Sequence, residues 1–138
     1  MWCGAHSAPL PVIVGLGIDL VEIARVRRLI DDKGERAIRR LFTGQEASYA
    51  AACEDPSHRF AARIAAKEAA YKALAGNDLA RAIGWRELEV VAVAGAAPTL
   101  RFHGRAEQRA TELGVERVWI SLTHERAHAA AVVVLERG

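Results

Sequence analysis

The stretch GLGIDLVEI, residues 15–23, places a carboxylate close to the end of an apolar segment. We predict a buried strand over Val12–Ile18, with Asp19 near its end. Side chains on a strand alternate between two faces, so Gly15, Gly17 and Asp19 share one face. Glycine inside a strand often marks close approach by a ligand or by another backbone. The pattern therefore indicates either a shallow ligand site with a charged end, or a bulge followed by a helix that Asp19 caps.

The size and composition of the chain indicate one globular domain. It has 138 residues, of which 51% are hydrophobic and 26% are charged, as expected for a domain large enough to bury its own core. We expect residues 1–11 to form an N-terminal tail and residues 12–138 to form a single domain. The formal net charge of +2 is too small to indicate nucleic-acid binding.

Several signals of export or membrane insertion are missing from the sequence. No apolar run approaches the ~18 residues of a membrane span. The first residues lack the basic and apolar segments of a signal peptide. Cys3 and Cys53 are the only cysteines, and their spacing matches neither a metal site nor a disulfide framework. We therefore expect a cytoplasmic protein that binds no membrane.

Beyond the first strand, apolar periodicity and turn residues predict helices and strands in separate groups. Thr43, with Glu46 three residues later, forms the capping box of a short helix. Helices are predicted over residues 21–31, from Thr43 to about Ala52, from Ser57 to about Gly76, and over 104–114; strands are predicted over Leu88–Val93, Thr99–Phe102, Val118–Thr123 and Ala129–Glu136. Segregated strands and helices favour an α+β fold over a doubly wound sheet.

The predicted helix after Ser57 carries charged residues beside an apolar stripe. Glu68 borders that stripe, and Lys72 follows four residues later, in the favourable orientation for a helical ion pair. The stripe comprises Phe60, Ile64, Tyr71 and Leu74, and a basic ridge comprises Arg59, Arg63 and Lys67. These charges either form solvated ion pairs or gather at the edge of a ligand site, where many alanines let a ligand or a backbone approach closely.

Two further segments carry polar chemistry. In SLTHE, Ser121 and His124 lie where a predicted strand enters a turn, a usual place for phosphate or hydroxyl contacts, although a single histidine there is also typical of an ordinary turn. Between Arg25 and Arg40 there are seven basic and three acidic residues. This segment is either a solvated face or a surface that meets an acidic protein partner.

Three segments together resemble the holo-acyl-carrier-protein synthases, the short class of 4′-phosphopantetheinyl transferases. They are GLGIDLVEIARV, RFAARIAAKEAAYKAL and WISLTHERAHAAAVVVLE, and the resemblance extends from about Val14 to Glu136. It implies an α+β fold in which an antiparallel sheet packs against a long helix. It also implies transfer of the 4′-phosphopantetheine arm from coenzyme A to a serine of an apo-acyl-carrier protein, with release of adenosine 3′,5′-bisphosphate. The sequence leaves open whether this carrier serves fatty acid synthesis, polyketide synthesis or another pathway.

The resemblance also implies roles for individual residues. Asp19 and Glu68 correspond to the Mg²⁺ ligands, and Lys72 to the active-site lysine near the reacting phosphate. Mg²⁺ suits this reading, because it combines one or two carboxylates with water and substrate phosphate. The family chemistry also needs a base for the serine proton, for which Glu68 and a metal-bound water held by Asp19 are both candidates.

Other matching residues extend the expected site to coenzyme A, the carrier and a neighbouring subunit. Arg63, Lys72, Ser121 and His124 correspond to coenzyme A contacts, and Arg25 and Arg28 to contacts with an acidic carrier. The family enzyme is a homotrimer with sites shared between subunits.

Two alternative functions use the same residues. One is a Mg²⁺-dependent phosphohydrolase built on the two acids. The other is a module that binds an acidic protein through Arg25, Arg28, Arg36 and Arg39.

Overall fold

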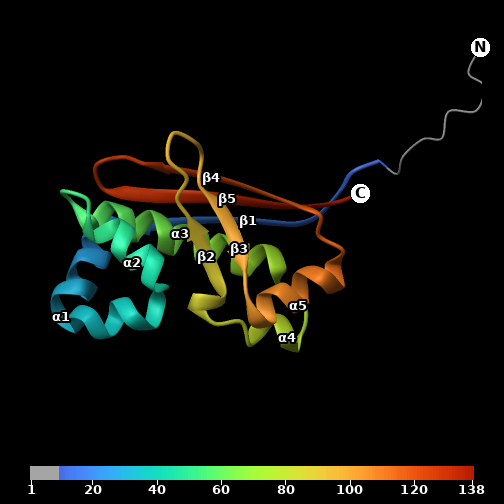
Figure 1. Ribbon diagram of the computed structural model, residues 1–138, viewed down its shortest axis with the longest axis horizontal. Helices are drawn as coiled ribbons and strands as arrows, with labels where there is room; N and C mark the ends of the chain where they lie inside the picture. The colour runs from blue at the N-terminus through green and yellow to red at the C-terminus, as the bar shows by residue number, and fades with distance from the viewer. Residues whose placement is uncertain (1–9) are drawn as a thin grey trace, which may run out of the picture.

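The computed structural model describes residues 10–138, so most of the predicted tail, residues 1–11, lies outside the described residues. In chain order the elements are β1 (Val12–Glu22), α1 (Ile23–Leu41), α2 (Gly44–Ala51), α3 (Pro56–Leu74), α4 (Asp78–Arg81), a 3₁₀ turn η1 (Trp85–Glu87), β2 (Leu88–Val91), β3 (Thr99–Phe102), α5 (Gly104–Leu113), β4 (Arg117–His124) and β5 (His128–Arg137) (Figure 1). The predicted α+β class is confirmed.

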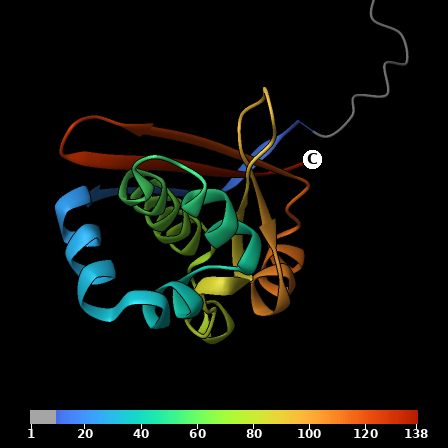
Figure 2. The same ribbon diagram turned by 60° about the vertical axis from the view of Figure 1, so that its left-hand side comes forward.

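An antiparallel sheet with the strand order β1-β5-β4 forms one layer of the molecule, and β2 and β3 form a separate hairpin. The helices lie on one side of this sheet, with α1 and α2 at one end and α4 and α5 at the other (Figure 1). The long helix α3 lies between the sheet and α1 (Figure 2). No helix within residues 10–138 is both long and apolar enough to cross a bilayer.

The two glycines of β1 allow the backbone of α3 to pack directly on the strand. A Cβ atom added at Gly17 would lie 1.8 Å from the carbonyl oxygen of Ala69, and one added at Gly15 would lie 2.2 Å from that of Ala73. Real side chains essentially never make such contacts, so only glycine fits at either position. The glycine face therefore meets a helix backbone, and the expectation that these glycines clear space for a ligand is wrong.

The strand continues past the point where the sequence predicted its end. Asp19 pairs with Ala131 of β5, and the residue that precedes α1 as its N-cap is Glu22. The alternative in which Asp19 caps a helix is therefore wrong. Side chains alternate between the two faces of a strand, so Asp19 lies on the same face as Gly17, two residues earlier, and faces α3.

Much of the core is built from the alanines of α3. Ala61, Ala65, Ala66, Ala69 and Ala70 are completely buried, because one face of the helix lies on the sheet and the others meet α1, α2 and β2. Arg63 and Lys67 are buried as well. The interpretation of the basic ridge as solvated ion pairs is therefore wrong for these two residues.

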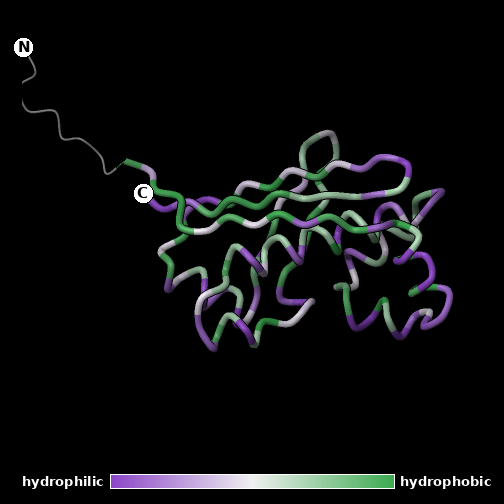
Figure 3. The backbone as a smooth tube through the Cα atoms, turned by 180° about the vertical axis from the view of Figure 1, so that it is seen from behind, coloured by the Kyte–Doolittle hydropathy of each residue, from purple (hydrophilic) through white to green (hydrophobic). Residues whose placement is uncertain are grey.

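The sheet surface opposite α3 is apolar and open. Leu16, Ile18 and Leu20 of β1 are each at least 64% exposed, and Trp119 of β4 is 56% exposed. Apolar residues run along all three strands, whereas α1 is largely polar (Figure 3). A contiguous apolar surface of this kind is typical of a protein interaction site.

Local capping signals were reliable guides to the remaining elements. The capping box of Thr43 and Glu46 is present at the start of α2, and Gly114 ends α5 in the left-handed conformation. The two predicted hairpins are found with small shifts of their ends. The prediction missed α4 and η1, and α1 continues to Leu41 across a break at Gly34.

Candidate active site

Three predicted site residues come together where β1 crosses α3. Asp19 points toward the helix from β1, and Glu68 and Lys72 lie one turn apart on α3. All three line a groove of about 600 Å³, which Arg25 of α1 also lines. The close packing at Gly17 and Ala69 produces this arrangement, because each acid is a near neighbour in sequence of one of those two residues.

Lys72 forms an ion pair with Asp19 rather than with Glu68 in this groove. The ammonium group of Lys72 lies 3.2 Å from Oδ1 of Asp19 and donates a hydrogen bond of 3.0 Å to the carbonyl oxygen of Ile18. Lys72 thus pairs across to the strand rather than along the helix with Glu68. Partial burial and the negative charge of Asp19 raise the pKa of Glu68, and the opposing effect of Lys72 is smaller.

The donor set of the groove suits Mg²⁺. The carboxylates of Asp19, Glu68 and the exposed Glu22 line the groove, and Glu22 lies 3.6 Å from the guanidinium of Arg28. Within residues 10–138 no group of three or more histidine, cysteine or acidic side chains gathers to hold a metal. Asp19 and Glu68, the two acids predicted from the sequence to bind Mg²⁺, match the one or two carboxylates that Mg²⁺ normally combines with water and substrate phosphate.

Two of the four predicted coenzyme A residues, Arg63 and His124, lie in a different cavity from Lys72. Arg63 and His124 line a space of about 240 Å³ that neither Asp19, Glu68 nor Lys72 lines. The guanidinium of Arg63 lies 4.5 Å from the centre of the Tyr49 ring, and burial lowers its pKa.

His58 and Arg59 add further potential positive charge to that cavity. The ring of His124 contacts His58 edge-on, at a distance of 5.5 Å between ring centres. Ser121 is exposed and alternates with Leu122 along β4. It therefore faces the outer side of the sheet, away from the cavity that Leu122 and His124 line.

Basic residues of α1 border the acid groove and continue beyond it. Arg25 lines the groove itself, and the exposed Arg28 lies 3.6 Å from a carboxylate oxygen of Glu22. A second groove of about 530 Å³ follows, lined by Leu29, Lys33, Arg36, Ala37, Arg40, Leu41 and Trp85. The basic segment is thus a charged face beside the acids, as a surface for an acidic partner requires.

Trp85 is a groove residue that the sequence analysis missed. It lies on η1 and lines both grooves as well as a smaller cavity of about 250 Å³ beside Glu68. The signal that could have found it is a large aromatic residue in a short connection between a helix and a strand, where it has no periodic apolar neighbours.

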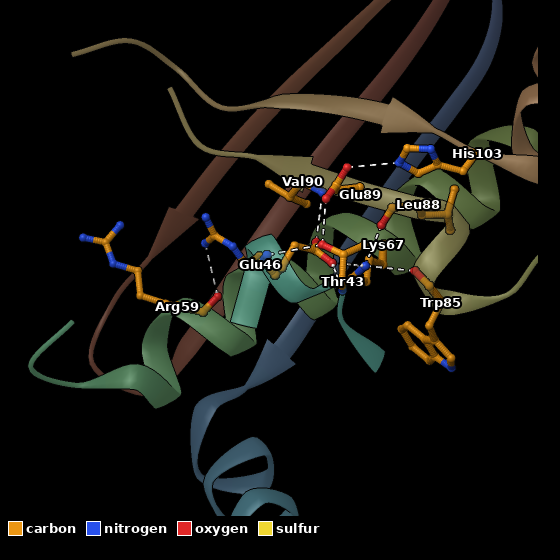
Figure 4. A network of polar contacts seen from close by, with 10 residues as sticks. Thr43, Glu46, Arg59, Lys67, Trp85, Leu88, Glu89, Val90 and His103 are labelled. Carbon is orange, nitrogen blue, oxygen red and sulfur yellow. Dashed lines mark hydrogen bonds and ion pairs between the residues drawn. The ribbon is translucent and has the colours of Figure 1, made fainter. Parts of the chain in front are cut away.

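A fully buried ion pair lies on the other side of α3 from Lys72. The ammonium group of Lys67 contacts Oε1 of Glu46 at 2.7 Å and donates hydrogen bonds to the carbonyl oxygens of Trp85 and Leu88, at 2.9 and 2.6 Å (Figure 4). Burial lowers the pKa of Lys67, against the attraction of Glu46. The pair connects α2, α3, η1 and β2.

Comparisons with known proteins find similar sequences over most of the chain. Residues 15–133 match the family model of the 4′-phosphopantetheinyl transferase superfamily. The chain is 50% identical over 125 residues to the holo-[acyl-carrier-protein] synthase of Thermus thermophilus, covering 91% of this chain and 94% of that protein.

Solved structures agree in fold. The holo-[acyl-carrier-protein] synthase of Neisseria meningitidis matches with a TM-score of 0.78 and 27% identity, over 90% of this chain and 98% of that one. The synthase of Bacillus anthracis, in complex with CoA (3′,5′-ADP), matches with a TM-score of 0.73 and 28% identity, over 91% and 98%.

Proposed function

The chain belongs to the 4′-phosphopantetheinyl transferase superfamily, and on this premise we propose that it transfers the 4′-phosphopantetheine arm of coenzyme A to a serine of an apo-acyl-carrier protein. The observation that carries the proposal is the convergence of Asp19, Glu68 and Lys72 on one groove. Adenosine 3′,5′-bisphosphate is the second product. We propose a carrier of fatty acid synthesis, in the cytoplasm, as the substrate.

Asp19 and Glu68 are the residues that would hold Mg²⁺, which supplies charge neutralisation for the pyrophosphate of coenzyme A. In the transfer, the serine oxygen bonds to the phosphorus that carries the pantetheine arm. The bond from that phosphorus to the bridging oxygen breaks, and the bisphosphate leaves with the electron pair. Lys72, beside Asp19, stabilises the negative charge that develops on the phosphate oxygens.

We assign the serine proton to Glu68. Glu68 is a carboxylate that lines the groove, so it can accept a proton from a hydroxyl group that enters there. Its place in the groove also puts it beside the reacting phosphate that Lys72 contacts in this proposal.

We propose that the active form is a homotrimer with sites shared between subunits. Two observations support this. The apolar surface of Leu16, Ile18, Leu20 and Trp119 is suited to packing against another chain. The acid groove and the cavity of Arg63 and His124 are also lined by separate residues within one chain, as we expect if each coenzyme A molecule contacts two neighbouring chains.

Arg25 and Arg28 are the residues we propose to meet the carrier. Both are exposed on α1, and Arg25 also lines the acid groove. A basic face there would orient an acidic carrier so that its serine enters beside Glu68.

Mass spectrometry of a purified apo-carrier tests the proposed reaction. After incubation with the protein, coenzyme A and Mg²⁺, we expect the carrier to gain the mass of one phosphopantetheine arm. An unchanged carrier together with released inorganic phosphate would instead identify a phosphohydrolase.

A further inference from the structure

We propose that Lys67, through its buried pair with Glu46, is a positioning residue that holds Trp85 and Glu68 together as one wall of the acid groove. This inference rests on the proposed function and deepens it. Lys67 does not face the groove of Asp19 and Lys72. It lines the small cavity that Trp85 and Glu68 also line, and it contacts the main chain of η1 and β2.

The ammonium group of Lys67 has all three of its donors occupied. It contacts Glu46 Oε1, the carbonyl oxygen of Trp85 and the carbonyl oxygen of Leu88, all within 2.9 Å. Lysine has three N–H donors and no acceptor, so the group is fully satisfied at a site with no solvent exposure. Two of the three bonds fix main-chain atoms at either end of η1.

Glu46 fixes the other side of the pair. Its Oε1 also accepts a hydrogen bond from the main-chain N–H of Thr43, and its Oε2 accepts one from that of Val90, both at 2.9 Å. The carboxylate is therefore held by α2 and β2 independently of Lys67. The ammonium group sits at a fixed point, and the carbonyl oxygens that it binds are fixed with it (Figure 4).

Trp85 and Glu68 are the groove residues that depend on this point. They line the same groove from η1 and α3, and they also line the small cavity between those two elements. The indole of Trp85 points away from the ammonium group that holds its carbonyl oxygen (Figure 4). Without Lys67, η1 loses the hydrogen bond that joins Trp85 to α3. The bonds that Glu87 accepts from His103 and Arg105 still hold the other end of η1, so we expect the indole of Trp85 to shift relative to the Glu68 carboxylate.

Stability alone does not account for a charged pair at this place. Replacing a buried ion pair by uncharged residues of similar volume is often neutral or stabilising, whereas removing one partner is strongly destabilising. The two effects can therefore be separated by comparing the single variant Lys67→Met with the double variant Lys67→Met/Glu46→Gln. Glu89→Gln is the control for loss of a buried negative charge near Lys67, because Glu89 accepts a hydrogen bond from Thr43 and contacts His103 but bonds neither α3 nor η1.

The melting temperature of each variant is measured by circular dichroism. The values of kcat and of KM for coenzyme A are then measured at a temperature where all the variants are folded. We expect Lys67→Met to melt at least about 10 °C lower. The double variant should regain part of that loss, because the unpaired buried charge is removed although an amide accepts only one of the two main-chain hydrogen bonds that the carboxylate accepts. In both, kcat falls about 100-fold, as a displacement of about 1 Å in the groove would cause. KM for coenzyme A changes less than about threefold.

The role is refuted if kcat recovers together with melting temperature in the double variant. It is equally refuted if Glu89→Gln, at a similar loss of melting temperature, loses as much kcat as Lys67→Met does. Mn²⁺ binding measured by electron paramagnetic resonance gives a second readout, with affinity about tenfold weaker in the double variant and unchanged in the control. If the wild-type protein transfers no arm, the proposed function fails, and the Mn²⁺ titration still decides whether Lys67 positions Glu68.

Discussion

Substitution of Gly17 by alanine tests the contact that brings Asp19 to α3. The added Cβ would lie 1.8 Å from Ala69 O and 2.7 Å from Ala69 C, so strand and helix would have to separate by more than about 1 Å before the contact reached normal packing distance. Overpacking of a core costs about 3 kcal/mol, and more where backbone must move. Alanine also lowers the entropy of the unfolded chain, which returns about 0.4–1 kcal/mol.

The net loss is at least about 2 kcal/mol, which corresponds to a fall of about 8 °C in melting temperature for a domain of this size. The separation also moves Asp19 away from Glu68, so we expect transfer by the folded variant to be about 100-fold slower. Calorimetry and the mass-spectrometric transfer assay, both below the melting transition, measure the two effects.

Gly44→Ala is the matched control, because nothing lies within 4 Å of a Cβ atom at that position. We expect it to melt at or slightly above the wild-type temperature and to retain full transfer activity. A Gly17→Ala protein that behaves like this control would refute the argument that direct backbone packing builds the site.

Three further predictions concern the surfaces and the pH dependence of the protein. Ile18→Asp places a charge on the exposed apolar face of β1, so sedimentation velocity should show monomers; an unchanged trimer would contradict the proposed interface. Arg28→Glu, at a proposed carrier contact that does not line the acid groove, should raise KM for the carrier about tenfold, through about 1.4 kcal/mol of lost attraction, with KM for coenzyme A unchanged; equal effects on both would argue against a carrier contact. Burial tends to raise the pKa of Glu89, but hydrogen bonds with Thr43 and His103 outweigh it and leave the pKa lowered. Glu89 therefore stabilises the fold above its ordinary pKa of about 4.3, and this stabilisation is lost as pH falls through the lower folded value. Glu89→Gln should show a shallower loss of unfolding free energy with acidification in that range; an unchanged slope would refute the linkage.

Local signals in the sequence predicted much of the fold, because they depend on neighbours in the chain. The capping box at Thr43 and the glycine that ends α5 are of this kind. The grouping of Asp19 with Glu68 and Lys72 also followed from the sequence, through the resemblance of three segments to one family. The contact between Gly17 and α3 brings these residues together. The sequence could not predict that α3 is the partner of Gly17, because a ligand and a helix backbone both favour glycine at such a position.

The buried pair of Lys67 and Glu46 could not be predicted in the same way. On a helix, Arg59, Arg63 and Lys67 have the spacing of an ordinary solvated ridge, and the acid that pairs with Lys67 lies 21 residues earlier in the chain. Arg63 and Lys67 are buried because α2 and β2 pack around α3, and this packing cannot be read from the spacing of the residues. Trp85 was missed for a related reason, since η1 has too few residues to show periodicity.

The transfer rate of Asp19→Ala and Glu68→Ala as a function of Mg²⁺ concentration tests most directly whether these two acids hold one divalent ion. We expect each variant to be at least about 100-fold slower than the wild type at saturating coenzyme A, and each to need more Mg²⁺ for half-maximal rate. Asp78→Asn, which changes a highly exposed acid, should match the wild type. Either alanine variant transferring the arm at the wild-type rate, with an unchanged Mg²⁺ dependence, would contradict the account.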